Sequence, residues 1–166
     1  QSKLGDIEPD RQARAQTLWS KEIAGIAVEG LVLDTEPGIQ VPLLLLKPAR
    51  TGGRLPVVIG FAQQGKERFL AERGADLKAL LDAGVAVCLP DVRGTGETAR
   101  DNNRGPGAMG LAATELMLGN TMLGARIKDA RAVFAYMARR PDIDVGRISL
   151  WGDSFAPANP ENIVPY

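Results

Sequence analysis

Residues 147–156 read RISLWGDSFA, and this stretch decides the fold. Ile148 to Trp151 predict a short buried strand, and the chain after it must turn sharply at Ser154. Such a turn holds the serine in a strained backbone conformation, so the residues two places before and after it have to be small. Gly152 and Ala156 meet this requirement. The stretch therefore predicts a strand that presents a serine on a tight turn.

The turn also matches a chemical motif. Gly152, Ser154 and Ala156 fit the nucleophile-elbow pattern Gly-x-Ser-x-Gly with alanine in the last place, and the required strand precedes them. Ser154 is therefore a candidate nucleophile that accepts an acyl group. The alternative is that Ser154 is an ordinary helix N-cap, a position at which serine is common.

Length and composition favour one globular domain. The chain has 166 residues, of which 45% are hydrophobic and 24% charged, and these values are close to globular averages. Lys+Arg and Asp+Glu number 20 each, so no charge excess favours nucleic acid or an anionic membrane surface. The longest apolar run, residues 41–46, is far too short to span a bilayer.

Metal and cofactor chemistry is not expected. The chain has no histidine, and its single cysteine, Cys88, lies in an apolar stretch that predicts a core position. Without histidine or clustered carboxylates no convincing metal site is predicted, and no cofactor is predicted either. The chain opens with Gln1, which fits a mature secreted or periplasmic protein after loss of a signal peptide, or an excised piece.

Four stretches predict strands before Ser154. Residues 26–34 and 39–47 are rich in β-formers and flank a Pro-Gly pair at 37–38, which predicts an antiparallel hairpin. Residues 55–61 and 85–89 are apolar without alternation, as expected for strands covered on both faces.

The segments between and before these strands predict helices and one long loop. Residues 9–20 predict a short leading helix or an arm, and a helix that includes Leu77 should stop at Gly84. Residues 91–110 predict a long loop, and residues 111–140 a long helix weakened around Gly119-Asn120 and Gly124. The predicted buried stripe of that helix consists of Leu123, Ile127, Ala130, Phe134 and Met137.

The order of these elements predicts an α/β fold. Apolar strands that alternate with helices indicate right-handed βαβ units, and hence a doubly wound, mostly parallel sheet with an antiparallel opening hairpin. Ligands bind such sheets outside the carboxyl ends of the strands. The loop after Phe61, the loop after Leu89 and the turn at Ser154 should therefore form one crevice.

With these segments in place, the chain resembles the amino-terminal half of an α/β-hydrolase, in the branch of acetyl xylan esterases, dienelactone-hydrolase-like esterases and prolyl-oligopeptidase-like enzymes. The resemblance covers roughly residues 26–156 and implies a division into an arm or short helix at 1–25 and a half domain at 26–166. It rests on the opening hairpin, PVVI at 56–59, LPDVRGTG at 89–96, RPDIDVGRI at 140–148 and the turn at Ser154.

The resemblance implies a set of site residues. Ser154 corresponds to the nucleophile, and the backbone N–H of Phe155 to one donor of the oxyanion hole. The second donor should come from Gln63 or Gln64, with Gln63 preferred, although many relatives carry His-Gly in this loop. Asp91 and Arg93 correspond to scaffold.

Two prolines after the turn depart from the family pattern. Pro157 falls in the first turn of the expected helix and is tolerable there, whereas Pro160 should shorten, kink or replace that helix.

The serine needs a base that this chain does not offer in the usual form. The family uses an acid and a histidine that follow the serine, and both would lie after Tyr166. Lys66 or Lys128 could serve instead, but solvated surface is the simpler interpretation of each. We therefore expect a second polypeptide or a C-terminal half to complete the sheet and the triad.

The sequence supports two main hypotheses. In the first, the chain is part of a serine hydrolase that acts on carboxylic esters, with acetylated carbohydrate or a small acyl ester as substrate. In the second, it is a non-catalytic or truncated α/β-hydrolase-like module that binds a ligand or partner. Peptidase activity is a third and less favoured hypothesis, because the sequence shows no gating domain.

Overall fold

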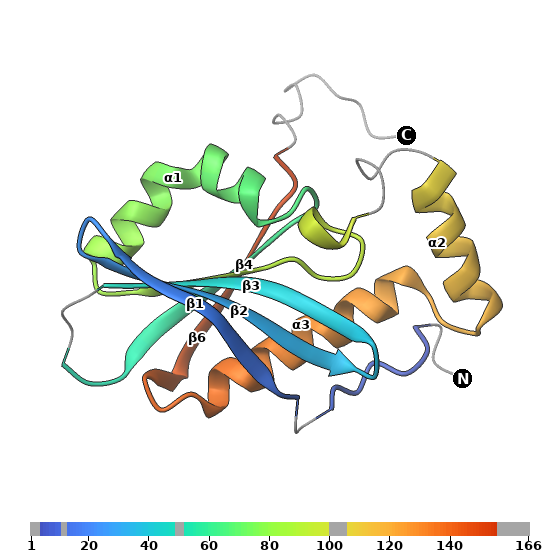
Figure 1. Ribbon diagram of the computed structural model, residues 1–166, viewed down its shortest axis with the longest axis horizontal. Coiled ribbons are helices and arrows are strands. Elements are labelled where there is room, and N and C mark those ends of the chain that lie inside the picture. The colour runs from blue at the N-terminus through green and yellow to red at the C-terminus, as the bar shows by residue number, and fades with distance from the viewer. Residues whose placement is uncertain (1–3, 11–12, 49–51, 100–105, 156–166) are drawn as a thin grey trace, which may run out of the picture.

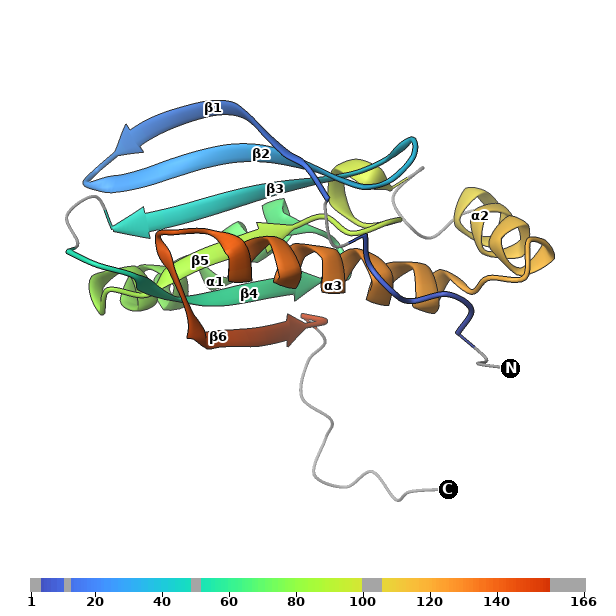
Figure 2. The same cartoon turned by 90° about the horizontal axis from the view of Figure 1, so that it is seen from below.

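The computed structural model describes residues 4–10, 13–48, 52–99 and 106–155. Within this part of the chain, one six-stranded sheet has the order β1-β2-β3-β5-β4-β6 (Figures 1 and 2). Its strands are β1 (Ala15–Ile23), β2 (Ile26–Glu36), β3 (Ile39–Pro48), β4 (Leu55–Ala62), β5 (Ala86–Pro90) and β6 (Ile143–Asp153).

The sheet combines an antiparallel and a parallel part. β1, β2 and β3 form an antiparallel meander, and β3 also pairs antiparallel with β5. β4 lies between β5 and β6 and is parallel to both. Because helices cover both faces, the predicted α/β class is confirmed.

The predicted hairpin of β2 and β3 is confirmed. The short helix predicted as one alternative for residues 9–20 is wrong. Residues 15–23 form β1, which pairs along the edge of β2. Ala24 and Gly25 both have positive φ, 51° and 78°, which is the backbone of the tight two-residue hairpin turn that suits the twist of strands. Pairing with β2 outweighs the weak helix preference of this segment.

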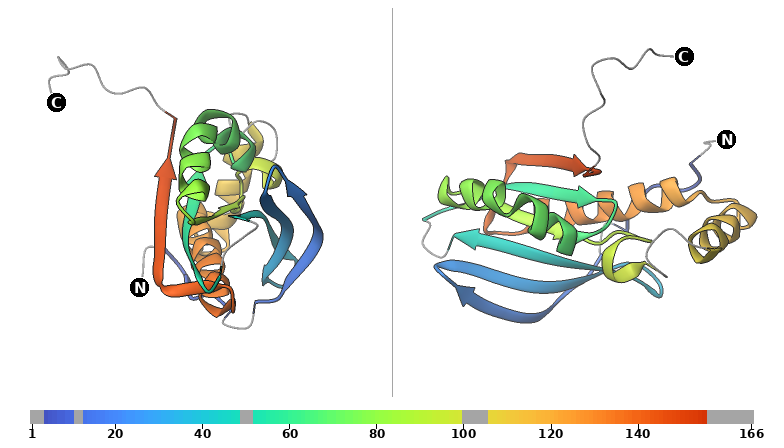
Figure 3. Two further views of the ribbon diagram at one scale, coloured as in Figure 1. Left: turned by 90° about the vertical axis from the view of Figure 1, so that its left-hand side faces the viewer. Right: turned by 90° about the horizontal axis from the view of Figure 1, so that it is seen from above.

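Helices α1 (Lys66–Asp82) and α3 (Met122–Arg139) pack on opposite faces of the sheet (Figures 2 and 3). Phe69 of α1 is fully buried in one core cluster, and Met137 of α3 is fully buried in the other. The predicted stop of α1 is confirmed, because Gly84 adopts φ 79° and its N–H donates to the carbonyl oxygen of Leu81.

The long helix predicted at 111–140 is two helices. α2 (Pro106–Met117) begins inside the predicted loop, where the short 3₁₀ helix η1 (Gly96–Thr98) also lies. The helical structure is interrupted around Gly119, as predicted. α3 starts after Thr121, whose hydroxyl accepts a hydrogen bond from the N–H of Gly124.

The predicted buried stripe of α3 is wrong in register. Leu123 and Phe134 are 60% and 42% exposed, whereas Met137 is buried. The face toward the sheet instead carries small residues and one charge. Its buried members are Gly124, Ala125, Asp129, Ala132, Val133 and Met137. Asp129 can be buried because it accepts hydrogen bonds from Arg93 and Thr35.

β6 stands at one end of the strand order, next to β4 (Figure 3). Its residue Leu150 is 65% exposed and Val145 is 57% exposed. Apolar side chains on an edge strand normally meet a covering layer. No helix in the described part of the chain is long and apolar enough to cross a membrane.

Candidate active site

The register of β4 and β6 determines which loops are neighbours. The two strands run parallel, and their last pairs are Phe61 with Gly152 and Ala62 with Asp153. Gln63 and Ser154 are the next residues, and they therefore follow adjacent strands at the carboxyl ends of the parallel strands. β5 flanks β4 on its other side, so the three loops predicted to share a crevice do begin at one edge.

Ser154 directly follows the last residue of β6 and is exposed. The strained backbone conformation predicted for it lies one residue later. Phe155 has φ 54°, and Ser154 is not among the described non-glycine residues with positive φ. The described backbone thus has its left-handed residue immediately after the serine, a conformation that is rare for a side chain as large as phenylalanine.

Asp153 bonds to the amide that the resemblance assigns to the oxyanion hole. The N–H of Phe155 donates to Asp153 Oδ1 at 2.7 Å, and Asp153 Oδ2 accepts from Arg73 Nε at 2.6 Å. The hydrogen bond from Arg73, followed by that from the Phe155 backbone, lowers the pKa of the Asp153 carboxyl. Asp153 therefore stays ionised near neutral pH and is a weak base.

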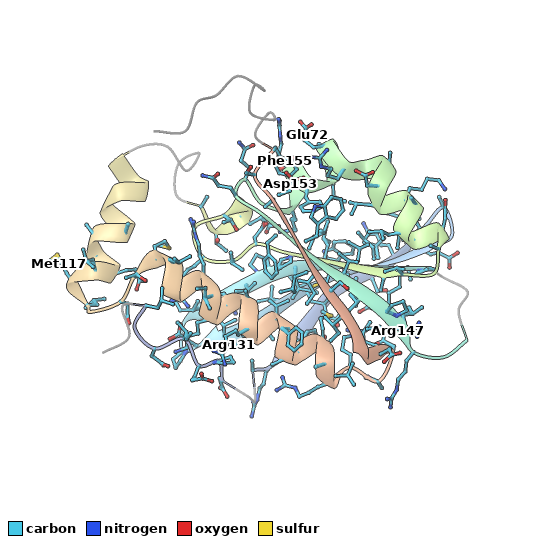
Figure 4. All side chains as sticks on the ribbon, turned by 180° about the vertical axis from the view of Figure 1, so that it is seen from behind. Glu72, Met117, Arg131, Arg147, Asp153 and Phe155 are labelled. Atoms are coloured by element: carbon cyan, nitrogen blue, oxygen red, sulfur yellow. The ribbon has the colours of Figure 1, made fainter. Side chains whose placement is uncertain are left out.

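An aromatic cluster supports the turn from the side of α1. The Phe69 ring meets the Trp151 ring edge-to-face at a centroid distance of 4.8 Å, and the Phe155 ring at 5.8 Å. Such contacts add to the burial of each ring. Figure 4 shows Asp153 and Phe155 at the end of β6.

The loop that should supply the second oxyanion donor is short. Only residues 63–65 separate β4 from α1, and Gln63 and Gln64 are exposed. Gly65 closes the loop, with its N–H donating to the carbonyl oxygen of Ala62 at 3.1 Å. A Cβ at Gly65 would lie 2.3 Å from the Cα of Gly96, and its φ of 86° with ψ of −179° is open to glycine alone.

Asp91 ties this loop to the one after β5. Its side chain is 1% exposed. Asp91 Oδ1 accepts the backbone N–H of Lys66 at 2.7 Å, and Oδ2 accepts the backbone N–H of Glu97 at 2.9 Å. One carboxylate therefore caps the first turns of both α1 and η1, where unpaired amides favour negative charge.

Neither lysine considered as a base has the surroundings of one. Lys66 Nζ lies 2.6 Å from Asp91 and also pairs with Glu97. Lys128 Nζ pairs with Asp6 at 2.9 Å and with Glu36 at 3.1 Å. The hydrogen bond to Asp6 raises the pKa of Lys128 above its usual value, which makes its neutral form still rarer at pH 7.

Arg93 has the scaffold role that the resemblance implies. Its backbone N–H and its guanidinium both bond to the buried Asp129, and its guanidinium also pairs with Glu36. Arg126 donates to the carbonyl oxygen of Arg93 at 2.9 Å. These bonds join β2, α3 and the loop after β5 below the candidate site.

Comparison with known proteins gives a consistent result. No protein-family model matches the chain. The Bacillus subtilis (strain 168) protein named "Putative hydrolase YtaP" is 30% identical to this chain over an alignment 164 positions long, which covers 91% of this chain and 52% of that protein.

Solved structures give the fold. A "putative acetyl xylan esterase" from Bacteroides fragilis NCTC 9343 has a TM-score of 0.74 at 17% identity, over 85% of this chain and 42% of that one. Acetyl xylan esterase 1 from Thermoanaerobacterium sp. JW/SL YS485 has a TM-score of 0.64 at 18% identity, over 86% and 45% of the two chains. The chain has the α/β-hydrolase fold. It spans about half the length of the proteins it matches.

Of the predicted site residues, Ser154 and the pair Gln63 and Gln64 follow the ends of two neighbouring parallel strands. Ala156, Pro157 and Pro160 lie outside the described residues, so the expected shortening of the next helix stays a prediction. The sequence did not predict that Lys66 and Arg73 would hold these loops, through their bonds to Asp91 and Asp153. For Arg73 the sequence holds no local signal, because its partner Asp153 is distant in the chain.

Proposed function

We propose that the protein is a serine hydrolase of carboxylic esters and that Ser154 is its nucleophile. The parallel register of β4 and β6 carries the proposal: Ala62 pairs with Asp153, so the exposed Ser154 and the loop that leads into α1 follow neighbouring strand ends. Acyl transfer needs a nucleophile and oxyanion donors on the same side of the substrate. The α/β-hydrolase fold and the hydrolase relative support the same reaction class.

The reaction would proceed in two steps. Ser154 Oγ attacks the ester carbonyl carbon, a base takes the hydroxyl proton, and the alcohol leaves to give an acyl-enzyme. Water then attacks the acyl group and releases the acid. The backbone N–H groups of Phe155 and of Gln63, or alternatively Gln64, stabilise the oxyanion in both steps.

For Phe155 to act in this way, its N–H must exchange partners. It bonds to Asp153 Oδ1 in the structure, and the same N–H has to bond to the substrate oxyanion in the reaction. Asp153 keeps its bond to Arg73 during the exchange, so the carboxylate is not left without a partner.

We also propose that the rest of an α/β-hydrolase domain covers β6 and supplies the histidine and the acid of the triad. Two apolar grooves flank β6, one against α1 and one against α3, and the exposed Leu150 lines both. Phe134 and Ile127 line the α3 groove, which explains why that helix carries apolar residues on its outer face. The chain matches only about half of its relatives' length, which leaves enough protein for this cover.

The substrate class is a further part of the proposal. Both solved structures described above carry acetyl xylan esterase in their names, one of them as putative. This favours acetylated carbohydrate, and small acyl esters fit the same chemistry. The competing proposal is a non-catalytic module, which one observation favours: the Phe155 N–H is already satisfied by Asp153.

A serine-directed probe separates these proposals. The complete protein is treated with a fluorophosphonate and analysed by intact mass, and hydrolysis of p-nitrophenyl acetate is measured in parallel. We expect labelling at Ser154, and a loss of at least about 10³-fold in kcat for Ser154→Ala. Ser149→Ala, a matched change on β6, should keep its activity. Hydrolysis by the Ser154→Ala variant at the rate of its parent would exclude Ser154 as the nucleophile. A parent that is not labelled and hydrolyses the ester no faster than buffer would support the non-catalytic module.

A further inference from the structure

Arg73 contacts the residues on both sides of Ser154. Its Nε donates to Asp153 Oδ2 at 2.6 Å, and its guanidinium carbon lies 5.7 Å from the centroid of the Phe155 ring. A planar guanidinium can make both contacts at once, one in its plane and one through its face. One side chain of α1 therefore spans the candidate nucleophile turn.

The backbone of α1 is distorted at this same residue. Arg73 has φ −117° and ψ 18°, outside the helical region, while the helix continues on either side. Gly74 follows, and a Cβ there would meet nothing within 4 Å, so close packing does not force a glycine at this point. A local departure from helical geometry at the residue that reaches the turn is a reason to look for a role at that residue.

Charge and exposure fit a directed contact. The Asp153 side chain is 13% exposed and that of Arg73 is 38% exposed, so the pair is partly shielded from water. Arg73 belongs to the same helix as Phe69, whose ring also touches Phe155. The turn is thus held to α1 by an ion pair, a cation–π contact and an aromatic contact.

We propose that Arg73 is a positioning residue that fixes the Ser154 turn against α1. It holds the Asp153 carboxylate and the Phe155 ring, and so sets the direction of the Ser154 hydroxyl and of the Phe155 N–H. When that N–H moves from Asp153 to the oxyanion, Arg73 remains as the partner of the carboxylate. The inference rests on the proposed function and adds a residue to it.

The test uses the complete protein and p-nitrophenyl acetate. Arg73→Met removes the charge and the donor but keeps an apolar stem of similar length. We expect kcat to fall by about 10- to 100-fold, because small misplacements of reacting groups cost rates of this order, with KM changed less than twofold. Arg73→Lys should recover part of kcat, since it restores the charge without the planar fork.

A matched control lies five residues earlier on the same helix. Arg68 pairs with Glu72 at 2.7 Å on the exposed side of α1, and Arg68→Met should leave kcat unchanged. Asp153→Asn removes the charge of the other partner in the ion pair and should lower kcat by a similar factor. The double variant Arg73→Met/Asp153→Asn should lose less than the product of the two single losses, because both remove one interaction.

The outcomes separate this inference from the proposed function. If Ser154→Ala abolishes hydrolysis but Arg73→Met keeps the kcat of the parent, or loses no more than Arg68→Met, Arg73 is not a positioning residue. If Ser154→Ala hydrolyses the ester like its parent, the function itself is wrong, whatever Arg73→Met does. Should Arg73→Met unfold, which far-UV circular dichroism reports, Asp153→Asn decides by the same criterion.

Discussion

Asp91 is the residue on which two candidate-site loops depend. It caps α1 and η1 with one carboxylate and pairs with the buried Lys66. Gly65 and Gly96 both approach it so closely that neither position has room for a Cβ. The loop after β4 is therefore shaped by an acid that follows β5, and the loop's own sequence does not reveal this.

Replacing Asp91 should destabilise the fold strongly. Asp91→Asn weakens the bonds to both backbone amides and leaves Lys66 buried with Glu97 alone, so we expect a loss of about 3 kcal/mol in the free energy of unfolding. Urea denaturation measures it. The exposed pair of Lys78 and Asp82 gives the control, and Asp82→Asn should cost less than about 1 kcal/mol. Similar small losses in both variants would contradict this role of Asp91.

Cys88 should be chemically silent in the folded protein. It lies in the middle of β5 with no exposed surface, and burial raises the pKa of its thiol to about 12. The thiolate is the reactive form, so at pH 8 the folded protein should react with Ellman's reagent only as fast as it unfolds. The reaction rate measured across a urea series should follow the unfolding curve. Rapid reaction without urea would show that β5 is accessible.

At the level of elements, α3 depends on its first turn. Thr121 separates α2 from α3 and accepts the Gly124 N–H at 3.0 Å. Loss of an N-cap hydroxyl typically costs about 1 kcal/mol, and Thr121→Ala should lower the free energy of unfolding by this amount. Thr114→Ala is the control, since that hydroxyl bonds within α2 to the Gly110 carbonyl oxygen and should matter less. Equal effects of the two changes would refute the cap.

The elements also show how far the sequence could predict the structure. The strand-forming runs at 26–34, 39–47, 55–61 and 85–89 were predicted from local pattern, because an apolar β-rich run has few alternative uses. The buried face of α3 could not be predicted in this way, because Asp129 is buried through hydrogen bonds to residues distant in the sequence. β1 was missed for a related reason: its nine residues are mostly exposed, and their strand structure comes from pairing with β2.

The candidate site was predicted less completely than the fold. The motif around Ser154 is local, so it could be recognised, and the β4 loop followed from the parallel order of the strands. Arg73 and Lys66 could not be recognised, because their partners Asp153 and Asp91 lie far away in the sequence.

At the level of the whole molecule, one ion cluster joins the meander to the segment before β6. Lys47 of β3 and Arg140 after α3 both pair with Asp142 at 2.7 Å, and both also pair with Glu29 of β2. The hydrogen bond from Arg140, and then that from Lys47, lower the pKa of Asp142 far below its usual value against the cost of burial. The cluster therefore ties together elements that are distant in the chain.

This cluster should make the free energy of unfolding depend on pH in the acidic range. Because the folded pKa of Asp142 lies below its unfolded value of about 3.9, its contribution is present above that pH and is lost as the pH falls toward the folded pKa. Asp142→Asn should be less stable than the parent at pH 7, and the difference should shrink between about pH 4 and pH 2. Urea unfolding at pH 7, 4 and 2.5 measures it. A difference that stays constant over this range would exclude the pair as its source.

The parallel pairing of β4 and β6 also has a consequence for synthesis. β1, β2 and β3 are neighbours in sequence and can pair as soon as they leave the ribosome, whereas β4 pairs with residues more than half the chain further on. Until those residues are made, one edge of β4 has no partner and can pair with a strand of another chain. The strand that ends just before the candidate nucleophile is thus also the one that pairs with the open edge of β4.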